Sequence, residues 1–273
     1  MDRKKIGLAL GAGAARGFAH IGVLQVLEEN NISIDMVAGS SMGALIGALY
    51  CCGISANMLG KMAVAGGNKP LFDYTISKMG FIKGDRVSGI MRLLTRDRDF
   101  DQLEIPLSVV AADLITCKPV VINTGKVYEG VRASISIPGI FVPVIKDSMV
   151  LVDGGVVDRV PVSVVSSMGA DIVIAVDVGF NGTHSKPKNV IEVFLQSMEA
   201  MEIELVRRKL ITADILIRPD VSNISMRRFD LAGECIEEGR RAAQEAMPAL
   251  LDLLGRSGQK DDSPEDGRQN NVG

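Results

Sequence analysis

Short apolar runs alternate along this chain with longer segments in which apolar residues recur every three or four positions. The first pattern is typical of buried strands and the second of helices packed on one side. Over the first fifty residues the order is strand, helix, strand, helix, predicted at 6–10, 19–27, 34–38 and 44–50. Strands that alternate with helices favour parallel pairing through right-handed crossovers, so we expect an α/β protein.

The rest of the chain continues this pattern with one interruption. Further strands are predicted at 105–111, 120–122, 150–153, 172–177 and 214–218, and helices at 190–209 and 232–254. Between residues 54 and 101 the periodicity weakens, and we expect a mobile cap. It would expose the scattered apolar side chains Met58, Met62, Leu71, Phe72, Tyr74 and Phe81. We expect one domain over residues 1–254 and a disordered tail over 255–273, which is nearly free of apolar residues.

Composition narrows the class of protein. Apolar residues make up 47% of the 273 residues, charged residues 23% and aromatic residues 4%, with a net charge of -3. Nucleic acid is therefore not an expected partner, because a basic field and stacking aromatics are both missing. The four cysteines fit neither a zinc pattern nor a disulfide framework, and the two histidines are isolated. We expect free thiols in the cytoplasm and no metal or organic cofactor.

Two segments have features of membrane targeting. The first 19 residues combine a basic start, an apolar stretch and small residues, as a signal peptide does. However, Arg16 and His20 come directly after the apolar stretch. Residues 36–60 lack charge, but glycine and serine dilute their hydropathy. We expect neither a secretion signal nor a transmembrane helix.

A glycine-rich turn, GAGAARG at residues 11–17, lies between the first predicted strand and helix. Backbone N–H groups at such a helix start can hold a phosphate or an oxyanion. A dinucleotide site needs a third glycine where this chain has Arg16, so nucleotide binding is the weaker interpretation, beside that of a plain structural turn.

Two further motifs carry groups for nucleophilic catalysis. GSSMG, from Gly39 to Gly43, places Ser41 between a strand and a helix, which is the setting of a nucleophile elbow. The sequence Asp153, Gly154, Gly155 ends another short strand. A serine hydroxyl needs a base within hydrogen-bond reach, and Asp153 could supply it, although Asp-Gly alone is a common turn.

The order of these motifs resembles the patatin-like phospholipases, especially bacterial proteins similar to the neuropathy-target-esterase catalytic domain. The shared segments are GAGAARG with AHIGVL, GSSMG, and SIPGIFVPV before LVDGG, within roughly residues 5–180. The resemblance implies a three-layer α/β/α sandwich with a mainly parallel central sheet. It also implies a Ser-Asp dyad that cleaves lipid esters as a phospholipase A, a lysophospholipase or an esterase, with peripheral contact to the inner face of a membrane.

Carried over to this chain, the resemblance makes Ser41 the nucleophile and Asp153 the base. The turn Gly11, Ala12, Gly13, Ala14 supplies the oxyanion hole, and Arg16 is the basic residue after it. Members of the family often carry glycine where this chain has Ala12 and Ala14, so a position there that needs a positive φ would be strained. The pair Asp158 and Arg159, and Ala112, also depart from the common pattern.

Two alternatives remain open at this level. One is a Ser-His-Asp triad of Ser41, His184 and either Asp153 or Asp177, in the chain order of α/β-hydrolases. The other is a protein that keeps the fold but only binds lipid or regulates, for which the thirteen methionines and the apolar content would suit an adaptable surface. The sequence makes no prediction of the oligomeric state.

Overall fold

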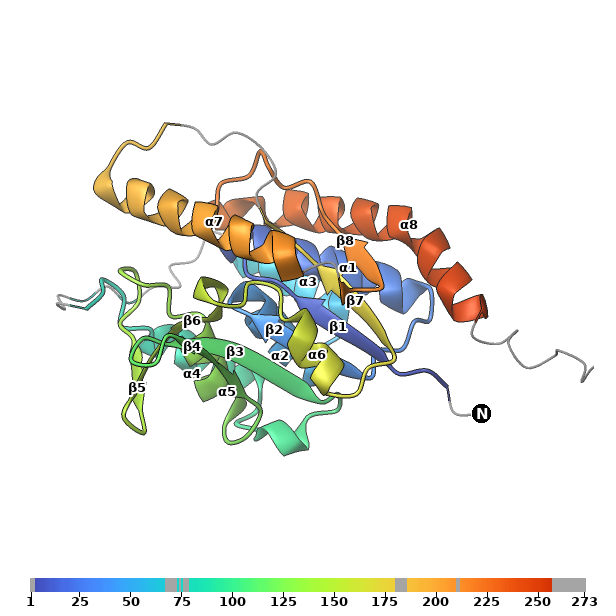
Figure 1. The fold of residues 1–273 in the computed structure, drawn as a ribbon, viewed down its shortest axis with the longest axis horizontal. Coiled ribbons are helices and arrows are strands. Elements are labelled where there is room, and N and C mark those ends of the chain that lie inside the picture. Colours follow the sequence, from blue (N-terminus) through green and yellow to red (C-terminus); the bar gives the residue numbers. More distant parts are fainter. Residues whose placement is uncertain are drawn as a thin grey trace, which may run out of the picture.

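The computed structural model describes residues 3–66, 73, 75, 79–179, 186–209 and 212–256, and within them eight strands form one sheet (Figure 1). The strands are β1 (Ile6–Leu10), β2 (Met36–Ser40), β3 (Leu107–Asp113), β4 (Lys118–Ile122), β5 (Val144–Lys146), β6 (Met149–Asp153), β7 (Ile172–Val176) and β8 (Ile215–Ile217). Their order is β5-β6-β3-β2-β1-β7-β8, and β4 also pairs with β3. The pairs from β3 through β2, β1 and β7 to β8 are parallel, which confirms the mainly parallel sheet.

Helices surround this sheet. They are α1 (Ala19–Glu29), α2 (Met42–Cys51), α3 (Ala56–Gly66), α4 (Asp85–Leu94), α5 (Val127–Ser134), α6 (Val162–Ser167), α7 (Val190–Lys209) and α8 (Ala232–Arg256). Short 3-10 turns are η1 (Ala14–Phe18), η2 (Phe100–Gln102), η3 (Gly154–Val156) and η5 (Phe229–Leu231).

The alternation of side chains along the strands produces two cores. On one face Leu8, Val37 and Val109 pack against α1, α2, α5 and α8. On the other face Ala9, Ala38 and Val110 pack against α6. Because these neighbours along each strand point to opposite faces, both faces are covered, and the three-layer α/β/α fold is confirmed.

The region from 54 to 101 is more regular than expected. It contains α3, which packs against α1 and α8, and α4, which packs against α5. Met58 and Phe81 are exposed as expected, whereas Met62 is partly buried. Leu71, Phe72 and Tyr74 lie outside the described residues, and the function of this region as a cap stays a prediction. The helical pattern was hidden because α3 buries mostly small residues, Ala56 and Gly60 among them.

Several smaller predictions differ from the structure. Strands β2 and β3 begin and end two residues later than predicted, and α8 continues to Arg256. Strand β5 and helices α5 and α6 were not expected. Most of the predicted tail, residues 257–273, lies outside the described part of the chain. Among the described helices none has both the length and the hydropathy that crossing a bilayer would require.

Candidate active site

The strand register brings the ends of two strands together beside β3. Strand β4 pairs with one edge of β3. Strands β2 and β6 both pair with the other edge, one after the other along its length. Ser40 of β2 pairs with Val110, and Asp153 of β6 pairs with the next residue, Ala111. Since β2 runs parallel to β3 and β6 antiparallel, the two strands meet at their carboxyl ends. This meeting point places Ser41 and Asp153 side by side.

Ser41 lies in a sharp turn between β2 and α2. Its backbone has φ 53 and ψ -120, a conformation that costs energy for a residue with a Cβ and is typical of strained functional positions. The turn is closely packed: a Cβ on Gly43 would lie 2.1 Å from the Leu10 carbonyl oxygen, and one on Gly39 2.6 Å from the Ala44 Cα. The GSSMG motif thus forms the predicted strand-turn-helix, and its glycines allow the close approach.

The Ser41 hydroxyl donates a hydrogen bond of 2.5 Å to Asp153 Oδ2. The other carboxylate oxygen, Oδ1, accepts from the N–H of Gly155 at 2.8 Å. Gly154 is required by packing, because a Cβ there would lie 2.2 Å from the Val110 carbonyl oxygen. A buried serine thus donates to a carboxylate that a second bond holds in place, as nucleophilic catalysis by a hydroxyl demands.

Two serines at the end of α5 hold both partners. The Ser134 hydroxyl accepts from the N–H of Ser41 at 3.0 Å and donates to the Val110 carbonyl at 2.6 Å. The carbonyl of Ser136 accepts from the N–H of Asp153 at 2.9 Å. The sequence analysis missed this role. The Ser134 hydroxyl beside apolar residues was a signal for its part, whereas the backbone carbonyl of Ser136 leaves none in the sequence.

Burial dominates the electrostatics of Asp153. It raises the pKa of this carboxyl to about 7, against the lowering effect of the hydrogen bonds from Ser41 and Gly155. The negative charge of Glu202 raises the same pKa further, and the positive charge of Arg159 lowers it. Arg159 is itself buried and donates to Glu202 at 2.8 Å. A carboxyl with a pKa near 7 is suited to accept and return a proton at neutral pH.

The glycine-rich turn lies against both other motifs. The Ala12 Cβ is 3.1 Å from where a Cβ on Gly155 would be, and the Met42 side chain fills the space beside Gly17. Among the N–H groups from Gly11 to Ala14, two already have acceptors: Gly11 donates to the Val176 carbonyl at 3.0 Å and Ala12 to the Arg159 carbonyl at 2.9 Å.

The remaining part of the turn is where a ligand could bind. Within the described part of the chain the N–H groups of Gly13 and Ala14 make no hydrogen bond to a backbone acceptor. Ala14 has φ 47, which is the left-handed conformation that the sequence analysis expected to be strained without glycine. The strained residue is the first of η1.

Arg16 does not contact the dyad. Its guanidinium binds Glu199 of α7 at 2.6 Å and the Ile224 carbonyl at 2.7 Å. Both partners of the ion pair are buried, and burial lowers the pKa of Arg16 while Glu199 raises it. The assignment of Arg16 to the substrate-binding turn stays a prediction, and in this structure its charge anchors α7 to the turn.

His184 and Asp177 belong to the alternative triad, and His20 is the other histidine of the chain. His20 is buried, and burial lowers its pKa to about 4, so the neutral ring donates from Nε2 to the Gly11 carbonyl at 2.8 Å. Asp177 lies near Arg159 and Arg218 and accepts from the N–H of Gly179. Neither residue contacts Ser41, and His184 lies outside the described residues.

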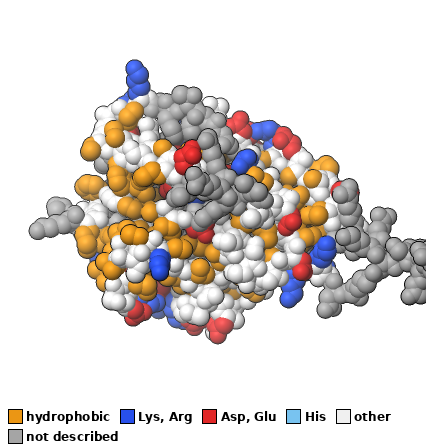
Figure 2. Space-filling view, in the orientation of Figure 1, with side chains coloured by type: hydrophobic (Ala, Val, Ile, Leu, Met, Phe, Trp, Pro, Cys, Tyr) orange, Lys and Arg blue, Asp and Glu red, His pale blue; other side chains and the backbone are white. Residues whose placement is uncertain are grey.

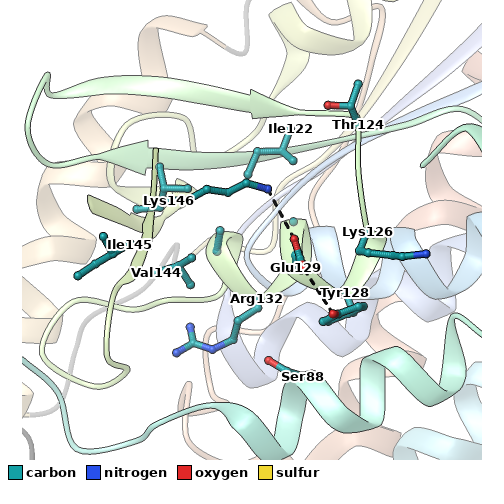
Figure 3. Close-up of a pocket in the computed structure, with 13 residues that line it drawn as sticks. Ser88, Ile122, Thr124, Lys126, Tyr128, Glu129, Arg132, Val144, Ile145 and Lys146 are labelled. Atoms are coloured by element: carbon teal, nitrogen blue, oxygen red, sulfur yellow. Dashed lines mark hydrogen bonds and ion pairs between the residues drawn. The ribbon is translucent and has the colours of Figure 1, made fainter. Parts of the chain in front are cut away.

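A separate cavity of about 380 Å³ opens between α5 and strands β4 to β6 (Figure 3). Its wall includes Val144, Leu151 and Tyr128, and Lys146 reaches across it to Glu129 at 3.6 Å. The dyad does not line this cavity. No cluster of three His, Cys, Asp or Glu side chains that could hold a metal ion is found among the described residues.

Comparison with known proteins shows which family this sequence resembles. A sequence model described as patatin-like phospholipase matches residues 8–166. An uncharacterized NTE family protein of Mycobacterium tuberculosis is 36% identical over 67% of this chain and 51% of its own length. A second one from that organism is 31% identical over 92% of this chain and 48% of its own. Patatin-like phospholipase domain-containing protein 6 of Mus musculus is 35% identical over 64% of this chain and 13% of its own. The chain thus spans about half the length of these two bacterial relatives.

Proposed function

Because this chain belongs to the patatin-like phospholipase family, we propose that it is a serine hydrolase that cleaves carboxylic ester bonds of lipids. Ser41 is the nucleophile and Asp153 the base in this proposal. One observation carries it: the 2.5 Å hydrogen bond from the hydroxyl of a strained, buried serine to a carboxylate whose pKa burial raises to about 7. A turn that served structure alone would need neither the strain nor the buried acid.

The reaction begins with proton transfer from the Ser41 hydroxyl to Asp153 as Oγ attacks the ester carbonyl carbon. The carbonyl oxygen becomes an oxyanion, for which the N–H groups of Gly13 and Ala14 are the donors that the turn leaves open. The tetrahedral intermediate then collapses, and Asp153 returns the proton to the departing alcohol.

The second half removes the acyl group. Asp153 accepts a proton from water, and the resulting hydroxide attacks the acyl carbon bonded to Ser41 Oγ. Collapse releases the fatty acid, and the proton passes back to Ser41. The Gly155 N–H keeps the carboxylate in one orientation through both halves. Phospholipids, lysophospholipids and neutral lipid esters are the proposed substrates, met by a cytoplasmic protein at the inner face of a membrane.

Labelling with a fluorophosphonate probe tests the proposal, alongside hydrolysis of a short-chain p-nitrophenyl ester. We expect Ser41→Ala to abolish labelling, and both Ser41→Ala and Asp153→Asn to lower kcat by at least about a thousandfold. Ser40→Ala is the matched control, because its hydroxyl is buried beside the nucleophile and has no hydrogen-bond partner among the residues that the structure describes.

Three outcomes separate the alternatives. Full activity of Asp153→Asn would refute the assignment of the base. Loss of activity in His184→Ala, with normal folding, would favour the triad. A wild type that resists the probe would point instead to a protein that keeps the fold and only binds lipid.

A further inference from the structure

Helix α7 carries carboxylates on its inner side and apolar side chains on its outer side. Glu199 and Glu202 have side chains that are 2% and 16% exposed. Val190, Val193, Phe194 and Met201 of the same helix are exposed by 79%, 49%, 44% and 62%. A surface helix normally has the reverse arrangement, with its apolar side toward the core and its charges toward water.

Ion pairs fix this inverted orientation. Glu199 binds Arg16 at 2.6 Å, and Glu202 binds Arg159 at 2.8 Å. Near the start of the helix, Glu192 binds Arg227. Turning α7 over to bury its apolar side would leave the buried Arg16 and Arg159 without these carboxylates, and unpaired buried charge costs several kcal/mol. The apolar side must therefore face outward while these pairs hold.

The outer side of α7 is continuous with the surroundings of the dyad. The helix packs against η3, which directly follows Asp153. The Phe194 ring lies 3.7 Å from the position of a Cβ on Gly139, in the segment after Ser136. The N–H of the exposed Phe81 donates to the carbonyl of Ile140 in that same segment.

Apolar side chains accordingly gather over one end of the molecule. Figure 2 shows them on the left of the view, over the N-terminal half of α7 and the strands β5 and β6 below it. We call this surface the apolar rim and define it as Val190, Val193, Phe194, Met201, Met79 and Phe81, of which Met79 is 50% exposed and Phe81 55%.

We propose that the apolar rim docks on a lipid bilayer that contains anionic lipids, so that α7 lies in the interface beside the active site. This inference rests on the lipid-ester function proposed above, because a bilayer is where that substrate resides. The charges agree: the acidic residues from Val190 to Met201 are Glu192 and Glu199, which both pair with arginines. Exposed Lys186 and Lys188 precede the helix and would meet anionic headgroups.

Vesicle binding tests the rim separately from catalysis. The full chain with Ser41→Ala is mixed with phosphatidylglycerol and phosphatidylcholine vesicles and sedimented, so that no product disturbs the bilayer. Replacing Val193, Phe194 and Met201 together by serine should weaken binding at least about tenfold, equivalent to about 1.4 kcal/mol. The matched control replaces Val64, Leu93 and Leu251 by serine, which are as exposed but lie on α3, α4 and α8.

A second measurement ties the rim to turnover. With Ser41 intact, the α7 variant should hydrolyse a soluble short-chain ester at the wild-type rate and lose activity on vesicles. Equal vesicle binding by the parent, α7 and control proteins would overturn the proposal, as would a parent that does not bind. A parent dimer that the α7 variant dissociates, without vesicle binding, would assign the rim to a second copy and also overturn it. Failure of labelling at Ser41 would refute the proposed function, whatever the vesicles show.

Discussion

The buried carboxyl of Asp153 makes the proposed reaction sensitive to pH near neutrality. Its pKa is raised to about 7, mainly by burial, and the base must be ionised to accept the Ser41 proton. About one tenth of the carboxyl is ionised at about pH 6 and nine tenths at about pH 8, so kcat/KM should rise roughly tenfold over that interval. An aspartate with an ordinary pKa would be ionised throughout and give a flat profile.

Glu202 provides the perturbation that tests this reasoning. Its Oε1 and the Asp153 Oδ1 lie 3.4 Å and 3.1 Å from the position of a Cβ on Gly155, so the two carboxylates are within about 6.5 Å of each other. At an effective dielectric constant of about 20, their repulsion is about 2.5 kcal/mol. Glu202→Gln removes it and leaves the positive charge of Arg159, which lowers the Asp153 pKa. We expect the midpoint of the kcat/KM profile to move down by at least about one pH unit.

The assay follows hydrolysis of p-nitrophenyl butyrate at the isosbestic wavelength of the product, with wild type, Glu202→Gln and a control. Glu204→Gln is the control, because this exposed residue lies two positions further along α7. A midpoint that stays in place or rises in Glu202→Gln, with an unchanged melting temperature, would refute the contribution of Glu202 to the Asp153 pKa. A flat wild-type profile would refute Asp153 as a base with a raised pKa.

Three further predictions concern the turns around the dyad. Ala14→Gly should raise the free energy of unfolding by about 0.5–1 kcal/mol in urea titrations, because glycine relieves the positive φ of 47. Gly154→Ala should unfold at a much lower temperature in calorimetry, or fail to fold, since the Cβ would lie 2.2 Å from the Val110 carbonyl. His20→Phe removes the donor to the Gly11 carbonyl and should destabilise the fold by about 1–3 kcal/mol. It should also lower kcat more than it changes KM. An unchanged kcat would show that the turn does not need this bond.

The sequence determined the central elements and pointed to the groups that we propose react. Buried strands such as β1 and β7 are short continuous apolar runs. Their length and the polar or glycine residues that bound them suffice to predict them. Ser41 and Asp153 could be named because the chemistry of an elbow and of a strand-end carboxylate is written in short motifs. The strain expected at a non-glycine position of the turn appears at Ala14 for the same local reason.

Tertiary structure alone decided how those groups are tuned. The meeting of β2 and β6 along β3 depends on two strand registers and brings together residues more than a hundred positions apart. The pairing of Arg16 with Glu199 was not predicted, because an ion pair across 183 residues leaves no local pattern. The sequence does not reveal that carboxylates of α7 point inward, because glutamates on a helix normally face the solvent. Burial and long-range pairing set the pKa of Asp153 and the direction that α7 faces, and neither is encoded within a single motif.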